Sequence, residues 1–146
     1  MEKRLLKVES VKVAVIDTNV LIRYLTNDEP QKAKAVESLL NKASDGELRI
    51  LIPSIVIAEL VWVLESYYRM KAEGIAELVE AILSTPGVEV TDKGIIASAL
   101  KLYRDNSIDL IDAWIISFVK ERDIKTIYTF DKKHYREIEG VETKVP

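Results

Sequence analysis

Four carboxylates, Asp17, Glu59, Asp112 and Asp131, stand where an ordinary structural role is hard to find. Asp17 ends the apolar run VAVI, and Asp131 follows TIYTF, a segment typical of a strand. An Asx turn or a helix N-cap would explain one such aspartate, but here each of two predicted strands is followed by an aspartate. Ligands of an open parallel sheet bind beyond the carboxyl ends of its strands, so both acids are expected at that edge.

Glu59 and Asp112 lie on segments with the period of apolar helices. Their neighbours three and four residues away are Ile55, Val56, Trp62 and Val63 for Glu59, and Ile108, Asp109, Ile115 and Ile116 for Asp112. A buried carboxylate without a partner is costly, and adjacent acids raise one another's pKa. Because neither helix offers an arginine or lysine at pairing distance, we predict that the four acids share one site. A remote basic partner is the alternative.

The low numbers of cysteine and histidine residues limit the kinds of metal site that the chain can form. The chain has no cysteine and a single histidine, His134, which excludes disulfides, thiolate zinc sites and any metal site that needs two histidines. Mg²⁺ or Mn²⁺, which prefer oxygen ligands, are then the expected metals. A divalent ion held by carboxylates can activate water and bind phosphate oxygens, which suits phosphodiester hydrolysis.

Length and charge bound the class of protein. The 146 residues suit one domain, which we place at residues 12–146 after an N-terminal extension, residues 1–11. A net charge of -3 disfavours a passive, strongly basic nucleic-acid binder. No apolar run resembles a signal peptide or is long enough to span a bilayer, so a cytoplasmic location is expected.

Strand and helix patterns alternate along the chain. Strands are predicted at residues 12–16, 46–53, 88–90, 125–130 and 141–146, and helices at 19–24, 27–43, 53–68, 71–85, 91–103, 107–123 and 132–138. This alternation predicts a three-layer α/β/α fold with a mainly parallel central sheet.

Four stretches, in this order, resemble the PIN-domain ribonucleases, especially the VapC toxins of toxin–antitoxin pairs: VIDTNVLIRYL, IPSIVIAELVWVLE, ALKLYRDNSIDLIDAWI and IYTFDKKH. The resemblance places the family's catalytic, metal-binding acids at Asp17, Glu59, Asp112 and Asp131. It also assigns supporting roles beside these acids to Thr18, Asn19, Asp109 and Thr129. A helix cap for Asn19 and a plain strand position for Thr129 are the alternatives.

The resemblance implies an endoribonuclease that depends on Mg²⁺ or Mn²⁺, with metal-bound hydroxide attacking phosphorus and the 3′-oxygen leaving. It further implies a homodimer and a VapB-like antitoxin as partner. A housekeeping RNA-processing nuclease and a non-catalytic RNA- or protein-binding module remain as alternatives. A phosphatase of the haloacid-dehalogenase type is disfavoured, because Asn19 stands where that family has its second aspartate.

Several other side chains have two interpretations. Arg23 is a candidate for contact with a substrate phosphate, and pairing on the helix surface is its alternative. A basic run after Asp131 could meet RNA phosphates or form a solvated helix face: Lys132, Lys133, His134 and Arg136. Aromatic and apolar side chains near the end of the second long helix could form a dimer or antitoxin surface or belong to the core: Trp62, Tyr67, Tyr68 and Met70.

Overall fold

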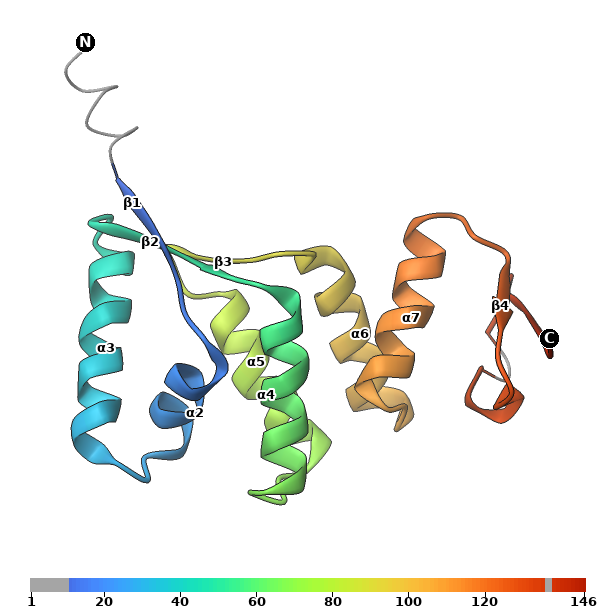
Figure 1. Ribbon diagram of the computed structural model, residues 1–146, viewed down its shortest axis with the longest axis horizontal. Helices are drawn as coiled ribbons and strands as arrows, with labels where there is room; N and C mark the ends of the chain where they lie inside the picture. Colours follow the sequence, from blue (N-terminus) through green and yellow to red (C-terminus); the bar gives the residue numbers. More distant parts are fainter. Residues whose placement is uncertain (1–10, 136–137) are drawn as a thin grey trace, which may run out of the picture.

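The computed structural model describes residues 11–135 and 138–146, in which strands and helices alternate (Figure 1). The strands are β1 (Lys12–Val15), β2 (Leu48–Ile52), β3 (Val88–Val90), β4 (Thr126–Tyr128) and β5 (Glu142–Lys144). The helices are α2 (Thr18–Thr26), α3 (Pro30–Ser44), α4 (Ser54–Ser66), α5 (Ala72–Leu83), α6 (Lys93–Asn106) and α7 (Leu110–Glu121), followed by the 3₁₀ helix η1 (Lys132–Tyr135). The predicted α/β class is confirmed, and each predicted element lies within a few residues of its expected place. The proposed extension, apart from Val11, lies outside the described residues.

All strand pairs are parallel, as the alternating pattern predicts. The strands β1, β2 and β3 form one sheet in that order, with Val13 beside Arg49 and Ile50 beside Val88. The strands β4 and β5 pair in a second, two-stranded sheet, with Ile127 beside Thr143. Parallel strands need a long crossover, and helices supply it between β1, β2 and β3. The sequence pattern did not indicate that the strands would divide between two sheets.

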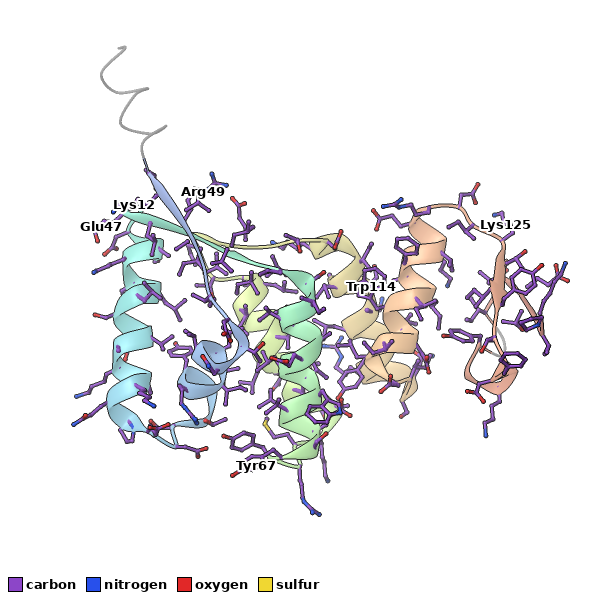
Figure 2. All side chains as sticks on the ribbon, in the orientation of Figure 1. Lys12, Glu47, Arg49, Tyr67, Trp114 and Lys125 are labelled. Atoms are coloured by element: carbon purple, nitrogen blue, oxygen red, sulfur yellow. The ribbon has the colours of Figure 1, made fainter. Side chains whose placement is uncertain are left out.

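The two faces of the three-stranded sheet differ. Helices α2 to α5 lie on one side of it (Figure 1), where Ile50 and Ile52 of β2 are fully buried. On the other face Val13 and Val15 of β1 are 55% and 61% exposed. Arg49 belongs to this second face, and Figure 2 shows it pointing away from the helices. The sheet therefore has one apolar, helix-covered face and one partly open face.

Two clusters of buried apolar side chains form the interior. The larger one joins the three-stranded sheet to helices α2 to α7, and the smaller one consists of Ile116, Val119, Ile127 and Tyr135. Helix α7 contributes to both, because Leu110 and Ala113 belong to the first cluster and Ile116 and Val119 to the second. Helix α7 thus joins the two clusters, and the change from one to the other falls between Ala113 and Ile116.

Close packing also sets the turn before β3. Gly87 has a positive φ of 80°, and a Cβ atom at this position would overlap the carbonyl group of Ala43 in α3. Only glycine combines this backbone conformation with so close an approach. Within the described part of the chain, none of the helices has both the length and the hydropathy that a bilayer crossing requires.

Candidate active site

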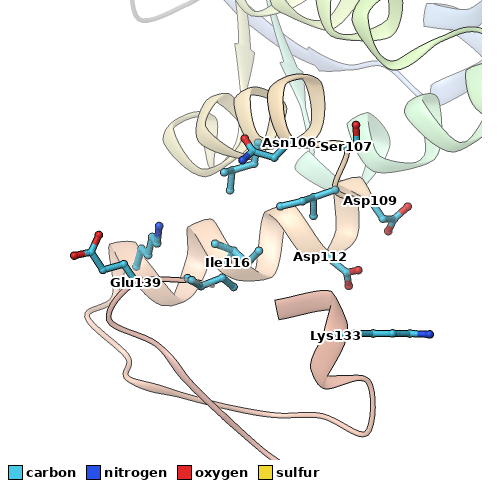
Figure 3. Close-up of a pocket in the computed structure, with 11 residues that line it drawn as sticks. Asn106, Ser107, Asp109, Asp112, Ile116, Lys133 and Glu139 are labelled. Carbon is cyan, nitrogen blue, oxygen red and sulfur yellow. The ribbon is translucent and has the colours of Figure 1, made fainter. Parts of the chain in front are cut away.

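Asp109 and Asp112 line a large cavity, of about 810 Å³, which lies between α6, α7 and the segment after β4. Asp109 is the N-cap of α7, and its Oδ2 accepts a hydrogen bond of 3.2 Å from the backbone N–H of Ile111. Figure 3 shows both carboxylates projecting from the same side of the helix, with Lys133 extending beside Asp112. The spacing of three residues brings the two acids together, as helical geometry requires.

Asp112 is tied to the segment that follows β4. The hydroxyl of Tyr135 donates a hydrogen bond of 3.1 Å to Oδ1 of Asp112, which is half-buried. Burial of the phenol, and next the charge and hydrogen bond of Asp112, raise the pKa of Tyr135 to about 12. The charges of Asp109 and Asp131 raise it further. Three acids that the sequence singles out therefore act on one tyrosine hydroxyl.

Asp131 itself is exposed and lies just after β4. Its backbone N–H donates a 3.0 Å hydrogen bond to Oγ1 of Thr129, which fixes the turn between the strand and η1. Arg136 and the side chains of Lys132 and His134 lie outside the described part of the chain, whereas Lys133 is described and lines the large cavity.

Asp17 lies in a different place, at the end of β1. It caps α2, because its Oδ1 accepts a 3.1 Å hydrogen bond from the backbone N–H of Asn19. Thr18 is buried beside it. The capping role that was one alternative for an aspartate at a strand end is thus present.

Glu59 is exposed on α4, which packs against α2. The inference that its apolar neighbours would bury it needs correction, because Ile55 and Trp62 are 75% and 66% exposed. The apolar stripe on that side of α4 faces outward, so the carboxylate carries no large desolvation penalty. In the part of the chain that the structure describes, Glu59 belongs to no group of three or more acids that could hold one ion.

Arg23 forms an ion pair with Glu29 at 2.7 Å, the surface pairing that was its alternative role. A hydrogen bond from Lys32, followed by the charge of Arg23, lowers the pKa of Glu29. Arg23 and Asn19 also line a cavity of about 360 Å³ together with Lys32. Two side chains that the sequence assigned to the site thus share a pocket, with a second cation beside them.

A further carboxylate, Glu65, was not singled out by the sequence. It lines a cavity of about 570 Å³ with Arg69, Tyr103 and Asp109, so this cavity meets the large one at Asp109. Burial raises the pKa of Glu65, against a hydrogen bond from Tyr103, and burial followed by the charge of Glu65 raises that of Tyr103. Tyr135 was also missed, and its one sequence signal is an aromatic residue within the polar stretch after Asp131.

The oxygen atoms of the acids at α7 are suitable ligands for a divalent cation. Carboxylate oxygens are the ligands that Mg²⁺ and Mn²⁺ prefer. Within residues 11–135 and 138–146, no group of three or more His, Asp or Glu side chains could hold an ion. Mg²⁺ is commonly bound by one or two carboxylates together with water and substrate phosphates. Asp109 and Asp112, one helical turn apart on a single cavity, fit a site of that kind.

The protein thus has an α/β fold with parallel strands and two acids at the start of α7. Comparison with known proteins identifies the family that has this fold. Residues 14–140 match the profile of the PIN domain, and the chain belongs to the PIN-domain family. This membership agrees with the predicted three-layer α/β/α architecture. The chain is 31% identical over 119 residues to a VapC ribonuclease from Aquifex aeolicus (strain VF5), covering 82% of this chain and 87% of the relative.

Among solved structures, the chain is similar to a chain in the crystal structure of VapBC2 from Rickettsia felis bound to a DNA fragment from their promoter. The identity is 18% and the TM-score 0.38, over 92% of this chain and 98% of that chain.

Proposed function

We propose that this protein is a VapC-like endoribonuclease that hydrolyses RNA phosphodiester bonds with the help of a divalent cation. The observation that carries the proposal is the pair Asp109 and Asp112, which lie three residues apart at the start of α7 and line a cavity of about 810 Å³, with the Tyr135 hydroxyl donating to Asp112. A relative named a VapC ribonuclease, 31% identical, supports the choice of RNA as substrate.

In this proposal Asp112 and Asp109 hold Mg²⁺ or Mn²⁺ at the large cavity. Asp131, Asp17 and Glu59 are the further catalytic acids that the resemblance to the family implies. When bound, such an ion neutralises phosphate charge and assists the attack of water on phosphorus. The carboxylates orient and deprotonate water, and Oγ1 of Thr129, which accepts a hydrogen bond from the backbone N–H of Asp131, holds that backbone for this task.

The polyanionic substrate needs local positive charge, because the chain as a whole carries a net charge of -3. Lys133 beside Asp112 supplies it at the large cavity. Arg23 and Lys32 supply it at the smaller cavity that Asn19 lines. We propose that these cations bind RNA phosphates on either side of the bond to be cleaved.

The proposal extends to partners. We infer a VapB-like antitoxin, a homodimer and a toxin role in the cytoplasm, on the strength of the similarity to a VapC protein. Trp62 and Tyr67 of the expected contact surface are 66% and 76% exposed, and Figure 2 shows Tyr67 at the far end of α4. Tyr68 instead donates a 2.5 Å hydrogen bond to Asp28, so its hydroxyl has an intramolecular role.

The test is RNA cleavage by purified protein with Mg²⁺, with Mn²⁺ and with EDTA. We expect Asp112→Asn to lower the cleavage rate at least about 100-fold, the scale seen when a preorganised electrostatic group is removed. Asp45→Asn, at an exposed acid ending α3, is the matched control and retains the parent rate. Equal rates for the Asp112→Asn variant and the parent protein, or full activity in EDTA, contradict the proposal.

Two further observations separate the alternatives. Growth arrest on expression, relieved by a protein encoded next to this gene, supports a toxin. Cleavage of RNA without toxicity supports a housekeeping nuclease. RNA binding that persists in EDTA, without cleavage under any metal, supports a binding module instead.

A further inference from the structure

Tyr135 connects the end of the chain to the candidate centre. Its ring is only 7% exposed and belongs to the smaller core cluster with Ile116, Val119 and Ile127. Its hydroxyl reaches out of that cluster and donates a 3.1 Å hydrogen bond to Oδ1 of Asp112. One side chain thus has an apolar anchor in the core and a polar tip on a carboxylate of the site.

Packing of the core does not require the hydroxyl of Tyr135. A phenylalanine ring would fill the same apolar space, and a buried hydroxyl costs free energy unless it forms a hydrogen bond. Asp112 supplies that bond, and in return a donor on Oδ1 fixes the rotation of the carboxylate about its last torsion angle. A carboxylate held in this way presents its oxygens to the cavity in one orientation.

Resting on the proposed function, we propose that Tyr135 is a positioning residue, whose hydroxyl holds the Asp112 carboxylate in the orientation that binds a divalent cation at the large cavity. Tyr135 is the last residue of η1, and η1 begins directly after Asp131. The same bond therefore holds the segment that carries Asp131 against the first turn of α7. Partners that orient a metal-binding carboxylate commonly change metal affinity 10- to 100-fold when removed.

The variant that tests this is Tyr135→Phe, with Tyr103→Phe as its matched control. Tyr103 is also buried, at 4% exposure, and also hydrogen-bonds to a carboxylate, that of Glu65. Both substitutions remove one hydroxyl from a packed ring. Only the first removes it from a proposed metal ligand.

We expect Tyr135→Phe to weaken Mn²⁺ binding about 10-fold, measured by calorimetry without RNA. The kcat for RNA cleavage should fall by a similar factor while KM for RNA changes less than about twofold, because the substrate contacts are untouched. Tyr103→Phe should leave Mn²⁺ affinity and kcat within about twofold of the parent. Equal losses in both variants, or no loss in Tyr135→Phe, overturn the assignment.

A second measurement depends on neither activity nor metal. The carboxyl ¹³C signal of Asp112 in metal-free protein should be a single sharp line in the parent and in Tyr103→Phe. In Tyr135→Phe it should broaden or shift, because the carboxylate rotates. An unchanged Asp112 signal overturns the inference even if the protein proves inactive, whereas inactivity of the parent with a shifted signal overturns the proposed function alone.

Discussion

Asp109 lies between two tyrosine–carboxylate pairs, Tyr135 with Asp112 on one side and Tyr103 with Glu65 on the other. Its charge contributes to the raised pKa of both tyrosines and of Glu65. It also lines both of the larger cavities. A single cap residue thus couples the electrostatics of two neighbouring pockets.

Glu65 offers a prediction at this scale, based on pH. Burial raises its pKa, so ionising it in the folded protein costs free energy; the cost is absent below the unfolded-state pKa of about 4.3 and complete above the folded-state value. Glu65→Gln removes this cost. We expect Tm at pH 7 to rise by about 1–3 °C, a modest gain because the side chain is partly exposed, and the gain to vanish at pH 4.

Calorimetry at the two pH values measures the effect. Glu77→Gln, at an exposed acid of α5, is the control and shows no such pH-dependent gain. A change in Tm that is the same at pH 4 and pH 7 would contradict the electrostatic cause.

At the scale of the elements, helix α3 and the turn before β3 lie very close together at Ala43 and Gly87. Because a Cβ at Gly87 would overlap the carbonyl group of Ala43, α3 or the turn must move to admit any side chain. The backbone oxygen of Gly87 also accepts a 2.9 Å hydrogen bond from Ile50 of β2. A shift of this turn would therefore disturb the hydrogen bonds that pair β2 with β3.

Gly87→Ala should accordingly lower the free energy of unfolding by about 3 kcal/mol or more, measured in urea. Gly46→Ala is the matched control, since Gly46 has nearly the same φ, 81°, with open space around its Cβ position. It should cost only the conformational penalty of about 1 kcal/mol. Equal costs at both positions would show that the contact with Ala43 is unimportant.

The elements themselves could be predicted from the sequence, since local periodicity and the breakers Pro86, Gly87 and Pro53 determine them. Asp131 at a strand end and the Asp109–Asp112 pair could be predicted on the same local grounds. Strand pairing could not, because it depends on contacts between distant segments, and so the two sheets were missed. The Tyr135–Asp112 bond spans 23 residues and was missed for the same reason.

For the whole molecule, the open face and edge of β1 is the feature that most affects behaviour in solution. Val13 and Val15 are more than half exposed, and within the described chain β1 pairs with β2 alone. Exposed apolar edge strands favour pairing with other chains. The partly open face therefore predicts concentration-dependent association.

The double variant Val13→Lys/Val15→Lys should change the free energy of unfolding by less than about 1 kcal/mol, because neither valine side chain is in the core. Sedimentation velocity should show weaker association than in the parent at high concentration. Ala35→Lys/Ala81→Lys adds the same charge at exposed positions of α3 and α5 and should leave association unchanged. Equal weakening in both double variants would point to net charge instead of the strand.

The bridging position of α7 has a consequence for biosynthesis. Its first turn packs in the larger core cluster, whereas Tyr135 and Ile127, which close the smaller cluster, are translated later. A chain is synthesised from its N-terminus, so Asp109 and Asp112 leave the ribosome before the hydroxyl that orients Asp112. On the proposed function, the centre is finished only after Tyr135 has emerged, so a nascent chain that carries both acids but not yet this tyrosine is a poor nuclease.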